Sequence, residues 1–177
     1  MISRAGRATQ RRTRTISSAL ARAVGSGPSA TKVIDMSQAH QLQSMLDSQQ
    51  APDCAALTPC KVEEADLELG RVVLVFAPQP AFRNHFGNVQ GGFAVSMIDV
   101  LVSIAAYAKT RRWLPTVEIK SSFVAPMKLG ECRGEAAVVR AGRQLVFLEA
   151  RLWGEDGKLA VHASATVLVQ DLPTPAS

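Results

Sequence analysis

Cysteines and aromatic residues are both scarce in this sequence, and the shortage of cysteine excludes whole classes of protein. Its three cysteines, Cys54, Cys60 and Cys132, are an odd number, which argues against a secreted disulfide framework and favours a reducing compartment. Their spacing matches no metal-binding motif, so we expect no metal. No uninterrupted apolar run reaches the ~18 residues of a membrane-spanning helix, so we also expect no membrane span.

Acidic residues are nearly absent from residues 1–35, which hold seven of the 20 basic residues and one of the 15 acidic ones, Asp35. The rest of the chain therefore has 13 basic and 14 acidic residues. The positive charge belongs to a tail and gives little support for nucleic acid binding. We interpret this basic tail as disordered, as an upstream extension of a reading frame that starts at Met36, or as a mitochondrial targeting segment. We expect a cytoplasmic protein, or a protein of the mitochondrial matrix if the tail is a transit peptide.

The remaining residues predict one domain in which strands surround a single long helix. Residues 36–59 predict a short N-terminal helix followed by a linker. Strand-like runs at 61–69 and 71–77 precede the long helix, and four more follow it, at 116–125, 131–140, 143–153 and 158–169. Residues 171–177 predict a disordered C-terminal tail. This α+β pattern buries the long helix only if an antiparallel sheet, within residues 60–170, curls around it.

The stretch Asn84–Tyr107 is the centre of this pattern, because a glycine-rich loop leads directly into a helix that is apolar on nearly every face. A helix that is apolar all round must be buried on most sides. The carboxylate in its middle, Asp99, is costly there unless it is paired or used, and perturbed acids tend to mark functional sites. The alternative interpretation is a buried structural acid that a serine or threonine caps.

This stretch also resembles a known family. The spacing of its polar residues and glycines matches a family motif at six positions: Asn84, Gly87, Gln90, Gly91, Gly92 and Asp99. Together with the later segments FVAPMKLGE and RAGR, this motif resembles the hotdog-fold acyl-CoA thioesterases. The resemblance is to the PaaI-like branch of the 4-hydroxybenzoyl-CoA thioesterase superfamily. The resemblance covers about residues 60–170. It implies the hotdog fold, in which an antiparallel sheet curls around one long central helix. It also implies hydrolysis of acyl-CoA thioesters to free CoA and a carboxylic acid.

The resemblance assigns roles to five residues. Asp99 would act as general base or nucleophile, and the N–H of Gly91 would receive the negative charge that develops on the carbonyl oxygen. Asn84 would hold the water or the carbonyl, and Thr116 would support the water. Ser103 lies one turn beyond Asp99, close enough to orient its carboxylate. Plainer alternatives remain open: a turn residue at 84, close packing at 91 and a small helix-packing residue at 103.

Residues expected to bind the substrate lie in the same loop and in two later turns. Gln90 stands where many relatives have histidine and can donate to the thioester carbonyl, and Gly92 lets a ligand approach the backbone. By resemblance, the nucleotide and the pantetheine arm contact Phe123, Lys128, Arg140, Gly142 and Arg143. Arginine pairs well with phosphate, although the two arginines can also be solvated turn charges. The CoA thioester is the substrate, and no cofactor is expected.

Gly91 and Asp99 are eight residues apart, or ~12 Å along a helix axis, so they cannot both touch one thioester carbon within one chain. A site that uses both needs two chains with antiparallel helices, and the family's active sites lie at such a dimer interface. We therefore expect a homodimer with shared active sites, arranged as a dimer of dimers (a homotetramer). Two other functions remain open: a non-catalytic acyl-CoA-binding or sensor protein, and a hotdog dehydratase, which the missing histidine disfavours.

Overall fold

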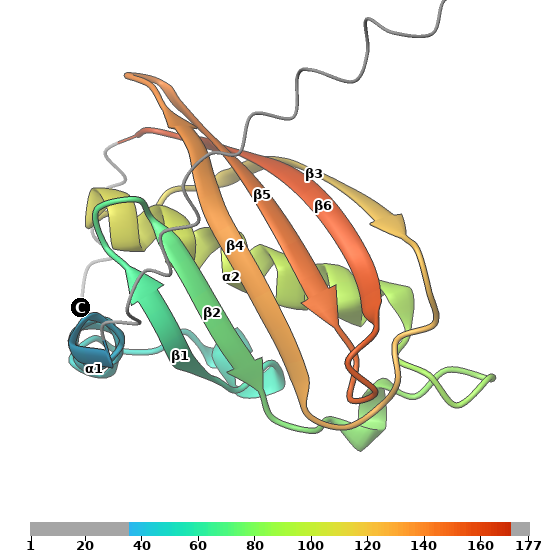
Figure 1. Ribbon diagram of the computed structural model, residues 1–177. Coiled ribbons are helices and arrows are strands. Elements are labelled where there is room, and N and C mark those ends of the chain that lie inside the picture. The colour runs from blue at the N-terminus through green and yellow to red at the C-terminus, as the bar shows by residue number, and fades with distance from the viewer. Residues whose placement is uncertain (1–35, 171–177) are drawn as a thin grey trace, which may run out of the picture. The chain divides into compact units, whose positions relative to one another are not determined.

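The computed structural model describes residues 36–170 (Figure 1). The predictions for the basic tail, 1–35, and for the C-terminal tail, 171–177, lie outside the described residues. Helix α1 (Met36–Asp47) stands where the sequence predicts a short helix, and the following linker contains a short 3-10 helix, Asp53–Leu57. A second 3-10 helix, Pro80–Phe82, precedes the long helix α2 (Gly91–Thr110).

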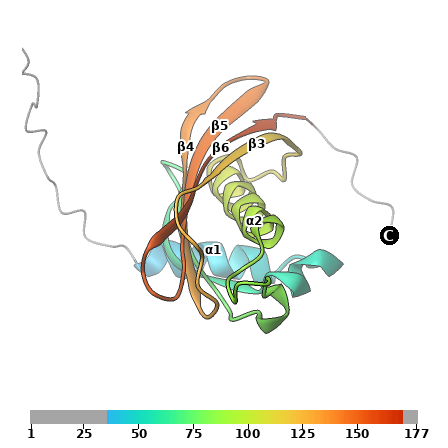
Figure 2. The ribbon, with the colours of Figure 1, turned by 90° about the vertical axis from the view of Figure 1, so that its right-hand side faces the viewer.

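Six strands form one antiparallel sheet around α2. They are β1 (Cys60–Asp66), β2 (Arg71–Phe76), β3 (Thr116–Phe123), β4 (Cys132–Ala141), β5 (Leu145–Trp153) and β6 (Leu159–Leu168). The strand order is β1-β2-β4-β5-β6-β3, so β1 and β3 are the two edges. The sheet curves over α2, as the view along the helix shows (Figure 2). The predicted fold class, an antiparallel sheet curled around one long central helix, is confirmed.

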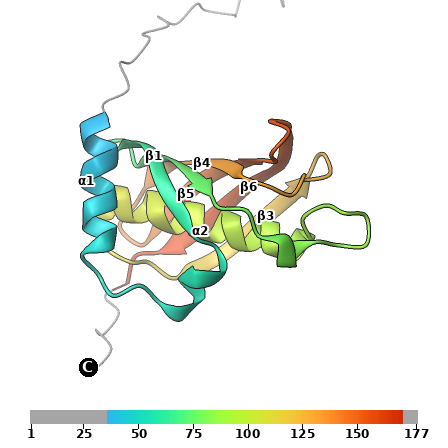
Figure 3. The same cartoon turned by 90° about the horizontal axis from the view of Figure 1, so that it is seen from below.

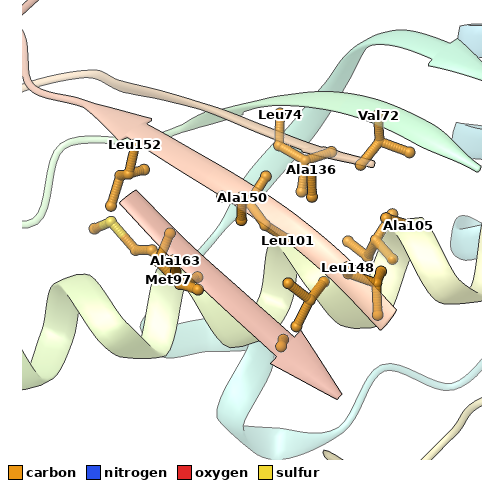
Figure 4. Close-up of a cluster of buried hydrophobic side chains, with 14 of the residues drawn as sticks. Val72, Leu74, Met97, Leu101, Ala105, Ala136, Leu148, Ala150, Leu152 and Ala163 are labelled. Atoms are coloured by element: carbon orange, nitrogen blue, oxygen red, sulfur yellow. The ribbon is translucent and has the colours of Figure 1, made fainter. Parts of the chain in front are cut away.

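The core lies between the concave face of the sheet and one side of α2 (Figure 4). Met97 and Leu101 of α2 pack against sheet residues that include Leu74, Leu148 and Leu152, and each of these side chains is at most 2% exposed. Gly134 of β4 lies directly beneath Leu101, where an added Cβ would overlap the leucine side chain. The absence of a side chain at this position lets the helix approach the sheet closely.

The side of α2 that faces away from the sheet is open over the first half of the helix, which corrects part of one expectation. Gly92, Phe93, Ser96 and Asp99 are exposed, whereas the residues that face the sheet are buried. The prediction that α2 is buried on most sides holds for residues 101–108, of which seven of eight are buried, and is wrong for residues 91–100 of a single chain. The alternative of Asp99 as a buried structural acid is also wrong for a single chain. By length and composition α2 could cross a membrane, but half of its most apolar window is buried in the domain, as in any core helix.

Helix α1 covers the β1 edge of the sheet (Figure 3). Ala39 and Leu42 are buried at this contact. Two glutamine side chains of α1 accept hydrogen bonds from backbone N–H groups along this edge: Gln43 Oε1 from Val62 (2.9 Å) and Gln38 Oε1 from Leu67 (2.9 Å). An edge strand with free N–H groups can pair with another chain, and α1 removes that opportunity at β1.

Candidate active site

Two adjoining grooves lie on the open side of α2. The first, with a volume of about 470 Å³, runs between α2 and the start of β3, and Asp99 lines it together with Ser96 and Thr116. The second, of about 710 Å³, lies at the N-terminus of α2 and is lined by Gly91, Asn84 and mostly apolar side chains. Of the two glycines that begin α2, Gly91 lines the second groove and Gly92 lines the first.

Asp99 is exposed in the first groove and hydrogen-bonded to Thr116, whose Oγ1 donates to Asp99 Oδ1 at 2.8 Å. The two predicted residues therefore meet although they are 17 positions apart. A hydroxyl that donates to a carboxylate fixes which oxygen stays free to accept a proton. Among the described residues, the hydrogen bond to this carboxylate comes from Thr116 and not from Ser103, which is half-buried on α2.

The N-terminus of α2 presents unbonded amides to the grooves. The N–H groups of Phe93 and Ala94 donate to the carbonyl of Gln90, whereas those of Gly91 and Gly92 have no acceptor among residues 36–170. Gln90, the N-cap, has an extended backbone (φ −64°, ψ 135°) and no capping side-chain bond. Free amides at the positive end of a helix dipole form a natural anion site.

At Gly91 the backbone also lies close to an aromatic ring. A Cβ added at Gly91 would lie 3.2 Å from Phe123 Cζ, whereas at Gly92 it would meet open space. Phe123 thus forms one wall of the second groove directly beside the Gly91 amide. The structure brings these two predicted residues together.

The loop before α2 uses Asn84 to hold its own shape. Asn84 Oδ1 accepts hydrogen bonds from the N–H groups of Phe86 (2.9 Å) and Asn88 (3.1 Å), and the Asn84 N–H donates to Asn88 O (2.8 Å). Gly87 completes the turn with φ 75°, a conformation that favours glycine. The side-chain carbonyl of Asn84 is therefore committed to the loop, and its NH₂ group is the part that can hold a ligand.

Asn88 is a residue of this site that sequence reasoning missed. Its Oδ1 accepts a hydrogen bond from Lys128 Nζ (3.1 Å), and the neighbouring Val89 N–H donates to Met127 O (2.8 Å). These contacts clamp the loop to the segment after β3 and so fix the start of α2. The sequence offered one signal for this role, namely that a second asparagine follows Asn84 by four positions with a glycine between them.

Comparison with known proteins agrees with this geometry. A family model described as the thioesterase superfamily matches residues 86–161. A protein of Saccharolobus solfataricus, provisionally named an esterase, is 31% identical over 103 residues, which are 58% of this chain and 74% of that protein. A solved structure from Ralstonia eutropha JMP134, provisionally named a thioesterase and phenylacetic acid degradation-related protein, is 30% identical. That match has a TM-score of 0.65 and covers 72% of this chain and 98% of the other.

The chain belongs to the thioesterase superfamily. The resemblance inferred from Asn84 to Asp99 is thereby confirmed, and these matches support a thioester hydrolase activity. Thioesterase superfamily member 2 from Mus musculus is similar in fold alone, with 18% identity, a TM-score of 0.60, and coverage of 76% of this chain and 96% of the other.

Within one chain, the predicted residues of this thioesterase-superfamily site fall into separate groups. Gly91 and Asp99 line different grooves, as their spacing along the helix requires. Arg140, Gly142 and Arg143 lie in or beside the exposed hairpin turn between β4 and β5, at the end of the sheet where β3 begins. Phe123, Lys128 and the exposed Gln90 lie at the other end, near the N-terminus of α2.

The cysteines stand apart from the site. Burial raises the pKa of Cys60 and of Cys132 from 9.0 to about 11, so both remain thiols at neutral pH and neither is an activated nucleophile. In the part of the chain that the structure describes, no three His, Cys, Asp or Glu side chains gather into a metal-binding group.

Proposed function

We propose that this protein hydrolyses acyl-CoA thioesters to free CoA and a carboxylic acid. The observation that carries the proposal is the open side of α2, which presents two unbonded amides and one carboxylate to grooves instead of burying them. Two donors and one acceptor therefore stand ready on the surface of the helix, where a ligand can replace the water that hydrogen-bonds them. Membership of the thioesterase superfamily supports thioester chemistry as that use.

In the proposed reaction, the Gly91 amide and the dipole of α2 stabilise the oxyanion that forms on the thioester carbonyl. Asp99, oriented by Thr116, either removes a proton from water as the water attacks the carbonyl carbon, or attacks that carbon itself. The C–S bond then breaks, the CoA sulfur leaves with the electron pair and takes up a proton, and the acyl group leaves as a carboxylic acid. On the Asp99-nucleophile route, water hydrolyses the resulting anhydride in a second step.

We propose a homodimer as the smallest active unit, since the two halves of the site line different grooves of one chain. An antiparallel second copy would bring its Asp99 to the Gly91 of the first, and a two-fold axis would create two such sites. The apolar surface beside β3 supports this partner: Val117 is 60% exposed, Phe123 55% and Val124 57%. The dimer of dimers expected from the resemblance stays a prediction.

The same two-fold arrangement would complete the nucleotide site. An antiparallel partner carries its β4–β5 hairpin to the end of the first chain where Phe123 and Lys128 lie. We therefore propose that Arg140 and Arg143 of one copy bind the CoA phosphates together with Lys128 of the other, while Gln90 and Gly92 contact the thioester. Cytoplasmic location, or the mitochondrial matrix if residues 1–35 target it, also remains a proposal.

The test is hydrolysis of a panel of short, long and aromatic acyl-CoA thioesters, with released CoA measured by chromatography. We expect turnover of at least one class by the wild-type protein and a loss of at least ~100-fold in Asp99→Asn, the scale of losing a general base. The variant should keep the fold and the oligomeric state. Near-normal hydrolysis by a pure Asp99→Asn sample would contradict the catalytic assignment. Binding of acyl-CoA without hydrolysis by the wild type would favour the sensor interpretation.

A further inference from the structure

The Thr116–Asp99 contact depends on a connection with little slack. From Asp99, α2 continues for eleven residues to Thr110, which carries the chain ~16 Å away from Asp99 along the helix axis. Only six residues then lead from Thr110 to Thr116, and six extended residues span at most ~20 Å. The chain must also reverse direction within them, so the path of residues 111–115 decides whether the Thr116 hydroxyl reaches the carboxylate.

The side chain of Gln49, which lies outside the site, anchors the middle of that connection through Trp113. Trp113 stacks on Tyr107 of α2, with ring centroids 4.6 Å apart and an interplanar angle of 21°. Gln49, two residues after the end of α1, joins both rings: its Nε2 donates to the Tyr107 hydroxyl (2.7 Å), and its Oε1 accepts from Trp113 Nε1 (2.7 Å). Gln49 is itself held, because Nε2 also donates to Met45 O (2.9 Å).

The hydrogen bonds of Gln49 act on a connection that is also held by burial and by backbone contacts. Tyr107 is buried, and Trp113 is 45% exposed, so the stacked indole also covers apolar surface at this point. Beyond it, Leu114 is buried and the carbonyl of Pro115 accepts a hydrogen bond from Leu168 N–H (2.9 Å). Between the left-handed residue Arg111 that ends α2 (φ 60°) and this sheet contact, Arg112 exchanges hydrogen bonds with the Thr110 hydroxyl. The bridge from Gln49 to Trp113 is the contact that ties this connection to the segment after α1.

We infer that Gln49 and Trp113 are positioning residues for catalysis: they set the return path that brings the Thr116 hydroxyl to Asp99. The N-terminal helix thereby acts on the active site from a distance, through Gln49, Trp113 and Thr116 in turn. This inference rests on the proposed role of Asp99. Neither Gln49 nor Trp113 touches the reacting atoms.

Three variants and one control test the inference by their effects on kcat and KM for the best acyl-CoA substrate. Gln49→Leu removes both hydrogen bonds to the rings. Gln49→Glu keeps an acceptor for both the indole N–H and the tyrosine O–H but loses the donor to Met45 O. Trp113→Phe keeps a stacked ring and loses the N–H donor. Gln43→Ala is the matched control, since Gln43 also belongs to α1 and bonds the sheet (Val62 N–H, 2.9 Å) far from this connection.

We expect Gln49→Leu and Trp113→Phe to lower kcat about tenfold with little change in KM, a smaller loss than the ~100-fold that a 1 Å misplacement can cause. Gln49→Glu should recover part of the activity, because it keeps the acceptors for the two rings but loses the bond to Met45 O, and Gln43→Ala should match the wild type. In a Thr116→Ala background, Gln49→Leu should lower kcat less than about twofold, because residues that act through one another are not additive.

Three outcomes would overturn the inference. A KM increase at constant kcat would show that Trp113 touches the substrate. An equal loss in Gln43→Ala would assign the effect to the general docking of α1. Full additivity of Gln49→Leu and Thr116→Ala would separate Gln49 from Thr116, and if Gln49→Leu does not fold, the same cycle with Trp113→Phe decides. Asp99→Asn, assayed in parallel, separates failure of this inference from failure of the proposed function, because full activity of Asp99→Asn would refute the proposed function itself.

Discussion

Replacing Gly91 by proline removes one candidate oxyanion donor with little disturbance of the fold. Gly91 is the first residue of α2, a position where proline is favoured because the missing N–H has no partner within the helix. The preceding residue, Gln90, already has the extended backbone (φ −64°, ψ 135°) that a following proline requires. Gly91→Pro therefore changes one polar group at the site, the amide that we assign to the thioester carbonyl.

The expected loss in kcat is roughly 100- to 1,000-fold, the scale of removing one oxyanion-hole donor. Gly91→Ala is the matched control, because it adds the same Cβ against Phe123 (3.2 Å) but keeps the N–H. Since Phe123 is 55% exposed, its ring can shift to accept that Cβ. We expect only a small change in kcat for Gly91→Ala, because this variant keeps the N–H donor.

Mixing then tests whether the site is shared between chains. Gly91→Pro and Asp99→Asn homodimers should each be nearly inactive, whereas a mixed dimer has one site with both defects and one with neither. Random co-refolding makes about half of the dimers mixed, so activity should recover to about one quarter of wild type for a two-fold interface. The assay is CoA release from samples whose mixed dimers are verified by mass. No recovery in such samples would place the site within one chain and refute the helix-spacing argument.

Three further predictions concern single contacts. Thr116→Ala should lower kcat about tenfold, the ~1.4 kcal/mol expected for a hydrogen bond to a charged group near solvent, and Thr116→Ser should recover it; equal loss in both would contradict a role for the hydroxyl. Of the three cysteines, exposed Cys54 should react with a chromogenic disulfide at pH 8 in the native protein, because burial raises the pKa of Cys60 and Cys132 to about 11; three fast thiols would refute this burial. Gln43→Ala should speed hydrogen exchange of the Val62 amide, while the Leu67 amide, bonded to Gln38, stays protected; unchanged Val62 exchange would mean that α1 does not cap this edge.

The fold was predictable because its signals are local. Alternation in the last strand, the Asp156-Gly157 turn and the glycine that separates the first two strands each act within a few residues and mark where strands lie along the chain. The pairing of β2 with β4 and of β3 with β6 does not follow from these signals. The open side of α2 was not predictable in the same way. Apolar residues on every side of a helix predict burial, but they do not tell whether the protein's own sheet or a second chain provides it.

The candidate site residues could be proposed from the sequence in proportion to how closely they follow one another along the chain. Gly91, Gly92 and Asp99 share one helix, so a pattern of spacing identifies them. The bond from Gln49 to Trp113 joins residues 64 positions apart, and that from Lys128 to Asn88 joins residues 40 apart. Glutamine, lysine and tryptophan at such separations leave no periodic signal, and only the folded chain shows that they meet.

The two edges of the sheet differ in a way that bears on how the active unit forms. At β1, α1 accepts backbone N–H groups through Gln38 and Gln43 and covers the strand. At β3, apolar Val117 and Phe123 remain largely exposed, and both site grooves open beside this strand. An open edge and an adjacent apolar surface invite association, and here association would also supply the missing half of each site. Burial of this surface beside β3 in a dimer would therefore also bring Asp99 of one chain to Gly91 of the other. The stability of the dimer and the positioning of its catalytic groups would then depend on the same interface.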